Sequence, residues 1–369
     1  MFLALRELRR TWRRFILVGL VVVLVATLST VLTGLANGLV TDGISGLRAL
    51  PLNHIAFAPN AEATFSRSTL DRQALEEWRA EPGVQSTPIG VSFVNAASES
   101  GGPSIDLALF GIETDSFLYG EAHARSASGV TGGESGLKGL VLSHELEEDG
   151  VEVGDRYRID GTGTSLPVIG FTFGGTYGHV PIAYTDLTIW QRALYGDDAR
   201  GRFSAIALIL PSGFDIGAAD RRAGTETLTR EDAYSGSPGY SAETATMTLI
   251  RAFLLVISAL IVGAFFTVLT VQRTRQIGLL KAMGASSSYV LRDGIGQITV
   301  VVVLSSAAGA VVGAGIIAGL SRGDIPIELS VTGILSSAGL LVVTGVIGSL
   351  FAFRRIARVE PAIALGVEQ

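Results

Sequence analysis

Several residue types are missing or rare in this chain of 369 residues. It has no cysteine, which excludes disulfides, thiolate metal sites, cysteine nucleophiles and covalent c-type haem attachment. Its two lysines are Lys138 and Lys281, and neither follows a glycine or precedes Ser or Thr. The sequence therefore contains no G-x-x-x-x-G-K-[ST] phosphate-binding loop, and any ATP must be used by another protein.

Histidine is also rare, and its spacing indicates no metal site. The four histidines are scattered and lack the short spacings with carboxylates or other histidines that are typical of zinc: His54, His123, His144 and His179. Ser143, His144 and Glu145 are consecutive, but neighbours on a helix point in different directions. They do not predict a catalytic triad, which is recognised by geometry.

Charge is absent from four long stretches, and the mean hydropathy of the chain is +0.45. The charge-free stretches are Phe15–Thr41, Ala252–Val271, Gly294–Ser321 and Leu329–Phe353. A helix crosses a hydrocarbon core of roughly 30 Å with about 20 residues. We therefore predict four transmembrane helices, and we read the first as a retained span because signal peptides have shorter apolar regions.

The remaining charge is divided unevenly along the chain. Residues 42–243 carry a net charge of −14 and the rest carries +8. Basic segments tend to stay in the cytoplasm, so we expect both termini inside and the acidic part outside. An acidic soluble domain also argues against nucleic-acid binding.

The expected fold is an α-helical membrane protein with four transmembrane helices in a 1+3 arrangement and a large extracytoplasmic α+β domain between the first and second. The predicted segments are an interfacial amphipathic helix at 1–14, spans at 15–41, 246–271, 290–320 and 329–353, the α+β domain at 42–245, a cytoplasmic coupling helix at 272–289, an outer loop at 321–328 and a cytoplasmic tail at 354–369.

Glycine spacing predicts where these spans pack tightly. Gly34 and Gly38 form a small-xxx-small pair, and the third span carries small residues at Gly309, Gly313, Gly315 and Gly319. Arg251 in the second span must snorkel, pair or face an aqueous cavity.

Short β-branched runs dominate the middle domain and predict a mixed sheet. The strands are expected at His54–Ala58, Val91–Ala96, Asp106–Ile112, Gly139–Leu142, Arg156–Ile159, Pro167–Thr172, Val180–Ala183 and Phe203–Leu210. Two helices are expected, at Asp71–Ala80, beginning from Ser68 or Asp71, and at Ser143–Asp149.

A basic stretch lies between the second and third spans: Gln272-Arg-Thr-Arg-Gln-Ile-Gly-Leu-Leu-Lys-Ala-Met-Gly-Ala-Ser286. Ile277, Leu280 and Gly284 recur at helical spacing, which gives a small apolar face. The stretch and its position resemble the hallmark of the FtsX/MacB-type (type VII) ABC transporter permeases. The 1+3 layout, the Gly136–Ile159 unit and the C-terminal tail resemble the same family.

The resemblance implies a function and partners. The stretch would be the coupling helix that docks on a cytoplasmic ABC ATPase, with the coupling residues Arg275, Gln276, Ile277, Leu280, Lys281, Met283 and Gly284. It implies two ATPase subunits, a second copy of this chain, a bacterial cytoplasmic membrane, and transmission of ATP-driven movement to the outer domain (mechanotransmission).

The spans carry almost no ionisable residue at mid-depth, which favours an amphipathic or lipid-soluble cargo. The overall resemblance is best to the Hrt-type haem exporter permeases, so haem is the candidate substrate. The residues that could meet its iron or its propionates are His54, Tyr240, Glu243, Met247, Arg48 and Arg251.

Two alternatives remain open from the sequence. The same machine could export a lipid, a peptide or an antibiotic. The chain could also be a non-transporting, FtsX-like regulator of a cell-wall hydrolase, in which case the outer domain should show an exposed apolar patch.

Overall fold

The structure is a computed structural model, and it describes residues 12–120, 137–199, 201–272, 279, 283, 286–321 and 327–356. The chain divides into two compact units. The helical unit comprises residues 1–39 and 244–369, and the sheet unit comprises residues 40–243. The expected interfacial helix at 1–14 and the tail at 354–369 lie mostly outside the described residues.

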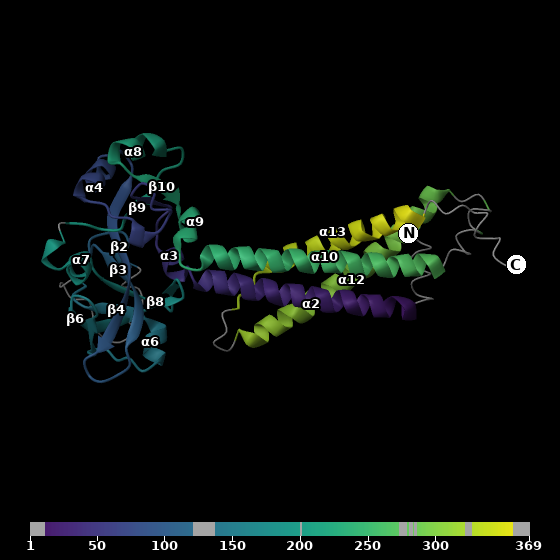
Figure 1. Ribbon diagram of the computed structural model, residues 1–369, viewed down its shortest axis with the longest axis horizontal. Helices are drawn as coiled ribbons and strands as arrows, with labels where there is room; N and C mark the ends of the chain where they lie inside the picture. Colours follow the sequence, from purple (N-terminus) through teal and green to yellow (C-terminus); the bar gives the residue numbers. More distant parts are fainter. Residues whose placement is uncertain are drawn as a thin grey trace. The chain divides into compact units, whose positions relative to one another are not determined.

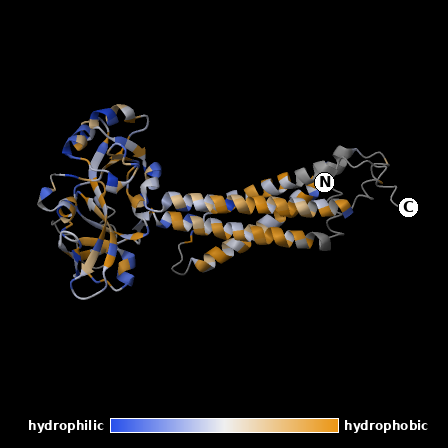
Figure 2. Ribbon diagram, viewed as in Figure 1, coloured by the Kyte–Doolittle hydropathy of each residue, from blue (hydrophilic) through white to orange (hydrophobic). Residues whose placement is uncertain are grey.

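Four long helices account for the helical unit and its connections (Figure 1): α2 (Trp12–Asp42), α10 (Tyr240–Gln272), α12 (Ser287–Leu320) and α13 (Val331–Ile356). They are predominantly apolar along their length (Figure 2). All four are long and apolar enough to cross a membrane. The predicted arrangement of one N-terminal and three C-terminal membrane helices, with an α+β domain between them in the sequence, is confirmed.

Small residues allow two of these helices to pack closely. A Cβ added at Gly309 of α12 would lie 2.5 Å from the carbonyl oxygen of Val23 on α2. Thr27 Oγ1 donates a hydrogen bond of 3.2 Å to the Gly309 carbonyl. A Cβ at Gly313 would lie 2.7 Å from that of Thr30. Gly309 and Gly313 therefore form the tight contact that their spacing predicts.

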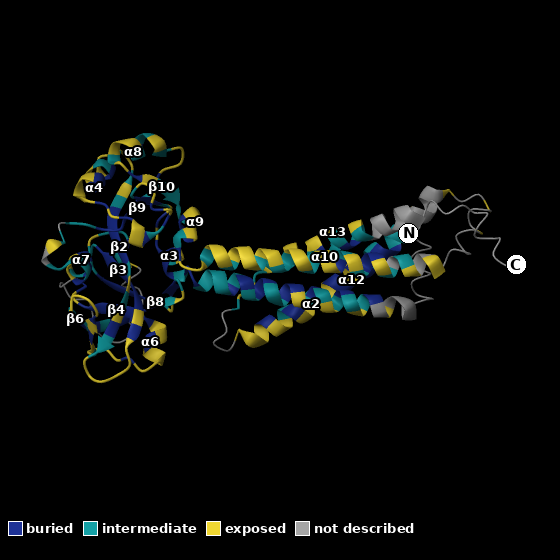
Figure 3. Ribbon diagram, viewed as in Figure 1, coloured by how far each residue is buried: buried dark blue, intermediate teal, exposed yellow. Residues whose placement is uncertain are grey.

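Other parts of the helices face outward. A Cβ added at Gly315 or Gly319 of α12 would have no described atom within 4 Å, so these two glycines do not extend the contact with α2. Large apolar side chains are exposed on these helices, including Phe253 and Leu260 on α10. Figure 3 shows many exposed residues along α10. Exposed apolar faces of this size suit a lipid environment rather than water.

The sheet unit is built on one mixed sheet. Its strands are β1 (His54–Phe57), β2 (Gln85–Ser98), β3 (Ile105–Ile112), β4 (Leu140–Ser143), β5 (Arg156–Ile159), β6 (Ser165–Thr172), β7 (Thr176–Tyr177), β8 (Val180–Asp186), β9 (Ala205–Ile209) and β10 (Glu226–Thr229). The order is β10-β1-β9-β2-β3-β8-β4-β6-β5, with β7 paired to β8. The β3–β8 and β4–β6 pairs are parallel and the others antiparallel.

The long strand β2 closes part of this sheet into a ring. Its first half pairs with β9 and its last residues pair with β5, with Ala96 opposite Ile159. Because β5 also ends the main path of the sheet, strands β2, β3, β8, β4, β6 and β5 form a closed circuit. The sequence predicts only the second half of β2, since Pro88 and Gly90 disfavour a strand. Pairing with β9 and β3 outweighs that local preference.

Short helices cover the sheet: α3 (Ser45–Ala49), α4 (Arg72–Arg79), α6 (His144–Glu148), α7 (Leu187–Tyr195), α8 (Ile216–Ala223) and α9 (Arg230–Ala233), with 3-10 turns η1 (Phe65–Arg67), η2 (Gly196–Asp198) and η3 (Tyr234–Gly236). The carboxylate of Asp71 accepts a hydrogen bond from the amide of Ala74, 3.2 Å away, and caps α4 as predicted. The sequence analysis did not predict α8 or β10, because short polar segments carry little apolar periodicity.

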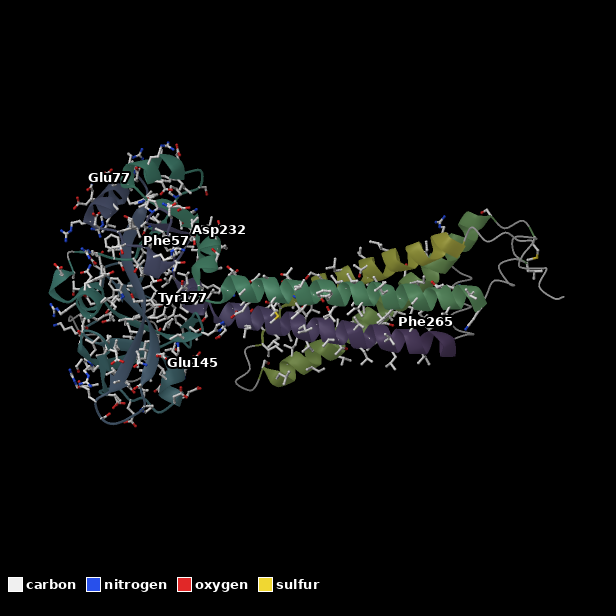
Figure 4. The ribbon with its side chains drawn as sticks, in the orientation of Figure 1. Phe57, Glu77, Glu145, Tyr177, Asp232 and Phe265 are labelled. Atoms are coloured by element: carbon white, nitrogen blue, oxygen red, sulfur yellow. The ribbon has the colours of Figure 1, made fainter. Side chains whose placement is uncertain are left out.

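Successive residues of β3 belong to two different cores. Leu107 and Leu109 pack in the core that contains Trp78 and Trp190. Ala108 and Phe110 pack in the other, which contains Tyr177 (Figure 4). Both faces of this strand are buried, which explains its nearly continuous apolar sequence.

Candidate functional site

A tight hairpin between β7 and β8 carries His179, one of the non-glycine residues with positive φ in the sheet unit. Its two turn residues, Gly178 and His179, both have φ of 61°. Two-residue hairpin turns with positive φ at both positions match the twist of the strands they join. The turn therefore fixes His179 in a backbone conformation that few non-glycine residues adopt, and it sets the direction of the ring.

The His179 ring lies between two carboxylates. Nδ1 is 3.0 Å from Oδ2 of Asp42, and Nε2 is 2.9 Å from Oε1 of Glu243. An ionised carboxylate only accepts hydrogen bonds, so both contacts are satisfied together when both ring nitrogens carry a proton. The geometry therefore favours a positively charged ring. We call Asp42, His179 and Glu243 the His179 clamp.

The surroundings of His179 act on its pKa in two directions. Burial by itself lowers the pKa, but the hydrogen bonds and negative charges of Asp42 and Glu243 outweigh it and hold the pKa above its usual value of 6.5. Glu145 lies nearby, and burial, followed by the charge of Asp42, raises its own pKa. The clamp is thus a cluster of acidic groups around one imidazole ring, and these groups favour the protonated form of the ring.

Backbone hydrogen bonds hold the hairpin against the segment that enters the sheet unit. The amide of Gly178 donates to the carbonyl of Gly43 at 2.8 Å. The amide of Thr176 donates to Ser45 Oγ at 2.8 Å, and the Thr176 hydroxyl donates to the Asp42 carbonyl. A Cβ at Gly43 would lie 3.1 Å from the His179 ring. The hairpin is therefore fitted closely to residues 42–45.

The segment that leaves the sheet unit is held in the same place. The Ser237 hydroxyl donates to the Gly43 carbonyl at 2.9 Å, and Glu243 completes the clamp six residues later in the chain. Asp42 is the last residue of α2, and Glu243 lies in the first turn of α10. One hairpin therefore contacts both chain ends of the sheet unit. Among the described residues no group of His, Cys, Asp and Glu is arranged to hold a metal ion.

The predicted haem contacts are distributed over several elements. Tyr240, Glu243, Met247 and Arg251 all lie on α10. Tyr240 packs against Tyr234, with ring centroids 6.2 Å apart. His54 is on β1, where its Nδ1 lies 2.9 Å from Oδ1 of Asn53. In the part of the chain that the structure describes, no hydrogen bond or ring contact joins His54 to Glu243 or Tyr240.

Two further candidates have distinct settings. Arg48 lies in α3, and its carbonyl oxygen accepts a hydrogen bond of 3.4 Å from Arg230. Arg251 lines a cavity of about 490 Å³ within the helical unit, together with residues of α2, α10 and α13 and the segment just before α13: Ser29, Thr33, Asn37, Leu255, Ser330, Thr332, Gly333, Ser336, Ser337 and Leu340. We call it the Arg251 cavity. The sequence analysis predicts that Arg251 pairs, snorkels or faces an aqueous cavity. In the structure Arg251 lines a cavity.

The predicted coupling residues can be described only in part. Arg275, Gln276, Ile277, Leu280, Lys281 and Gly284 lie outside the described residues. Met283 is described: its side chain is 70% exposed, and its amide donates to the carbonyl of Leu279 at 3.0 Å, as in a helical turn. The coupling assignment remains a prediction from the sequence.

The residues Ser143 and His144 have separate structural contacts. Ser143 Oγ is buried and accepts a hydrogen bond of 3.0 Å from the amide of Gly175. His144 is exposed, and its Nδ1 lies 2.7 Å from Glu147. The serine supports a loop and the histidine pairs along its own helix, so the two do not form a nucleophile and base.

Sequence reasoning missed two features of these sites. The sequence gives no local signal for the His179 clamp, because Asp42 and Glu243 lie 137 and 64 residues from His179 in the chain. The polar wall of the Arg251 cavity was also missed, although Ser29, Thr33 and Asn37 recur at i, i+4 and i+8 on α2. That spacing places three polar side chains on one face of an otherwise apolar helix. It is a signal in the sequence that indicates a polar cavity wall.

Comparison with known proteins adds three findings. Residues 248–361 match the family model described as FtsX-like permease C-terminal. A relative from Staphylococcus epidermidis, named as hemin transport system permease protein HrtB, is 23% identical over 369 residues, which cover 99% of both chains. The macrolide export ATP-binding/permease protein MacB of Azoarcus sp. is 30% identical over 132 residues, 35% of this chain and 20% of that protein.

Among solved structures, the extracellular domain of the noncanonic ABC-type transporter YknZ from Gram-positive bacteria aligns with 48% of this chain and 98% of its own, at 15% identity and a TM-score of 0.34. The family match falls on α10, α12 and α13 with the stretch between them, and the similarity to the staphylococcal relative runs from end to end. Residues 248–361 therefore belong to the FtsX-like permease family, and the chain as a whole is similar to permease subunits of ABC transporters.

Proposed function

We propose that this permease works with a separate ABC ATPase to export haem from the membrane by mechanotransmission. The observation that supports haem as the cargo is the end-to-end similarity to the relative named as a hemin transport permease. The similarity covers 99% of both chains. Haem is an apolar, flat molecule with two carboxylates, and it suits a machine whose helices offer apolar outer faces and few charges.

In this proposal two copies of the chain pair with two ATPase subunits on the cytoplasmic side. The coupling stretch around Ile277 and Leu280 docks on the ATPase, and both termini are cytoplasmic. The acidic sheet unit, of net charge −14 over residues 42–243, lies outside the bacterial plasma membrane, as the distribution of basic residues favours.

The His179 clamp supports the mechanical part of the proposal. Helices transmit displacement because their backbone hydrogen bonds are internal. Movement carried along α2 reaches Asp42, and movement carried along α10 reaches Glu243. Because His179 contacts both carboxylates, a relative displacement of the two helices would act on one hairpin of the sheet unit, which gives a rigid-body route to that unit.

The haem contacts are proposed on α10. Glu243 and Met247 are four residues apart on one helix and so share a face, and both side chains are partly exposed. A methionine thioether is a known axial ligand of haem iron, and we propose the Glu243 carboxylate as a further ligand on this face. Because Glu243 is also part of the clamp, haem binding at this face would compete with or rearrange the contact between Glu243 and His179.

The test is a haemin titration of the chain purified with its ABC ATPase. We expect a shift of the Soret band and stimulation of ATP hydrolysis, and weaker binding by Met247→Leu. Leu249→Met is the matched control, because it changes side-chain volume little at an exposed position of the same helix. If haemin causes neither a spectral shift nor stimulation, haem is not the cargo.

A second candidate function is suggested by a hollow of about 380 Å³ in the sheet unit. It is lined by residues that include Phe93, Val94, Val180 and Pro238. The Phe93 side chain is 44% exposed, and its ring stacks on the Tyr177 ring with the two ring centroids 5.7 Å apart. An exposed apolar hollow would suit an FtsX-like regulator that binds a cell-wall hydrolase. Phe93→Asp would then abolish control of wall hydrolysis while leaving haemin resistance of the cells unchanged.

A further inference from the structure

The Arg251 cavity combines one cation with many hydroxyl groups. The described residues that line it include four serines and two threonines, and none of these lining residues is acidic. Ser29 Oγ and Ser337 Oγ lie 2.8 Å apart and link α2 to α13. Its volume of about 490 Å³ is within the range of roughly 300–1,000 Å³ that is usual for small-molecule sites.

The described protein groups leave part of the hydrogen-bonding capacity of the Arg251 guanidinium unused. Its Nη2 makes two long hydrogen bonds of 3.4 Å, to the Thr33 carbonyl and to Asn37 Oδ1. Its Nε is buried without a hydrogen-bond partner in the part of the chain that the structure describes. Within the same described part, no carboxylate forms an ion pair with Arg251. A guanidinium presents a planar fork of donors that fits an oxyanion.

An unpaired cation inside a membrane-spanning helix is costly, so such a residue normally has a counter-charge or faces a functional cavity. Arg251 lies within the candidate span Tyr240–Phe265. The described residues that line the cavity supply hydroxyl donors around it but no negative charge. An anionic group of a ligand would complete such a site.

The cavity wall is not polar throughout. Leu255 and Leu340 also line it, and Leu340 is 50% exposed. Exposed apolar side chains continue on the same helices, including Phe253 on α10 and Leu335 on α13. A ligand whose anionic end enters the cavity can therefore keep an apolar body against the outer surfaces of the helices.

We propose that the Arg251 cavity binds the oxyanion head, a phosphate or a carboxylate, of an amphiphile dissolved in the membrane. The guanidinium of Arg251 pairs with the head, and hydroxyl groups such as that of Thr332 donate to its remaining oxygens. The apolar body stays in the bilayer beside Leu340. This goes beyond the proposed cargo, because the site recognises the head group and does not require iron.

The test uses the full chain in nanodiscs of zwitterionic lipid. Retention of added phosphatidylglycerol is measured by native mass spectrometry, and binding of haemin and of haemin dimethyl ester is measured by absorbance. Arg251→Gln should weaken binding of at least one of the two anionic probes about tenfold or more, which corresponds to about 1.4 kcal/mol, and should leave the diester unaffected.

Two further variants show whether a loss of binding by Arg251→Gln is specific to the cavity or results from misfolding. Thr332→Val removes one hydroxyl at an exposed position of nearly unchanged shape and should weaken the same probe about threefold, a smaller loss in keeping with a single neutral hydrogen bond. Arg292→Gln removes an exposed arginine of α12 that does not line the cavity and should bind like the unchanged chain.

The two probes distinguish the sources of the oxyanion. A loss confined to phosphatidylglycerol identifies a lipid phosphate, and a loss confined to haemin, with the diester unaffected, identifies a carboxylate of the cargo. If haemin does not bind but phosphatidylglycerol retention depends on Arg251, the assignment of the cavity as an oxyanion site is supported. The proposal that the protein exports haem is then wrong. If both anionic probes bind Arg251→Gln as tightly as the unchanged chain, or if the diester is weakened as much as haemin, the cavity assignment is wrong.

Discussion

His179 Nε2 lies 2.9 Å from Oε1 of Glu243, although the two residues are 64 positions apart in the chain. The opposite ring nitrogen lies 3.0 Å from Asp42. A single histidine side chain thus connects Asp42 and Glu243, which lie at the two chain ends of the sheet unit.

Replacing the His179 ring should lower the free energy of unfolding of the sheet unit. Charge-assisted hydrogen bonds contribute about 1.5–3 kcal/mol each when buried, and the side chain is a third exposed, so we expect His179→Gln to lower stability by about 1–2 kcal/mol. For a unit of this size that corresponds to roughly 2–8 °C in Tm. Thermal unfolding of the full chain checks it, with His144→Gln as the control, since His144 is also paired with glutamates but is exposed on one helix.

The contribution of the clamp should depend on pH in a defined direction. The folded-state pKa of His179 is raised above 6.5, so the stabilisation is fully present below about pH 6.5 and is lost as the pH rises through the higher, folded-state value. The difference in Tm between the unchanged chain and His179→Gln should therefore shrink on going from about pH 6 to about pH 9. A difference that grows with pH would contradict the assignment of a cationic ring.

The contact between α2 and α12 can be tested with a single methyl group. In Gly309→Ala the new Cβ would lie 2.5 Å from a backbone oxygen of α2, and overpacking of this kind costs about 1–3 kcal/mol. In Gly315→Ala the Cβ meets no described atom within 4 Å, so the higher helix propensity of alanine should leave stability unchanged or slightly increased. Heat inactivation in detergent measures both. Equal behaviour of the two variants would show that the helices do not meet at Gly309.

The coupling stretch provides a functional prediction. Ile277→Asp places a charge on the proposed docking face and should abolish stimulation of the ATPase by the permease while leaving Tm unchanged. Leu279→Asp introduces the same charge at an exposed position outside the face formed by Ile277, Leu280 and Gly284, and it should retain most of the stimulation. The measurement is ATP hydrolysis by the reconstituted complex. If Ile277→Asp is stimulated normally, the docking face has been assigned wrongly.

Much of the fold could be predicted because the strongest signals are local. A charge-free run of more than twenty residues specifies a membrane helix by its own length, and all four runs lie in long helices. The Asp71 cap of α4 is local in the same sense, since donor and acceptor are three residues apart. The glycine pattern of α12 was only partly informative, because Gly309 and Gly313 meet α2 whereas Gly315 and Gly319 do not.

The less predictable features depend on contacts between distant residues. Nothing near His179 in the sequence indicates Asp42 or Glu243, and the two-residue strand β7 that positions the ring is too short to show a periodicity. Similarly, Gly90 and Gly111 make room for Trp190, whose ring atoms would lie within 2.6 Å of a Cβ at either position. Such requirements are visible only after the strands and helices are assembled.

The strand pairing next to the chain's entry and exit has a mechanical consequence. β1 follows the entering segment and β10 precedes the leaving one, and they pair antiparallel with His54 opposite Thr229 at the end nearest both connections. Tension that separates the two connections would unzip this ladder one hydrogen bond at a time, starting from that pair. Because Asp42 and Glu243 both contact one hairpin outside the ladder, the contacts of His179 would bear such tension before the pairing of β1 with β10.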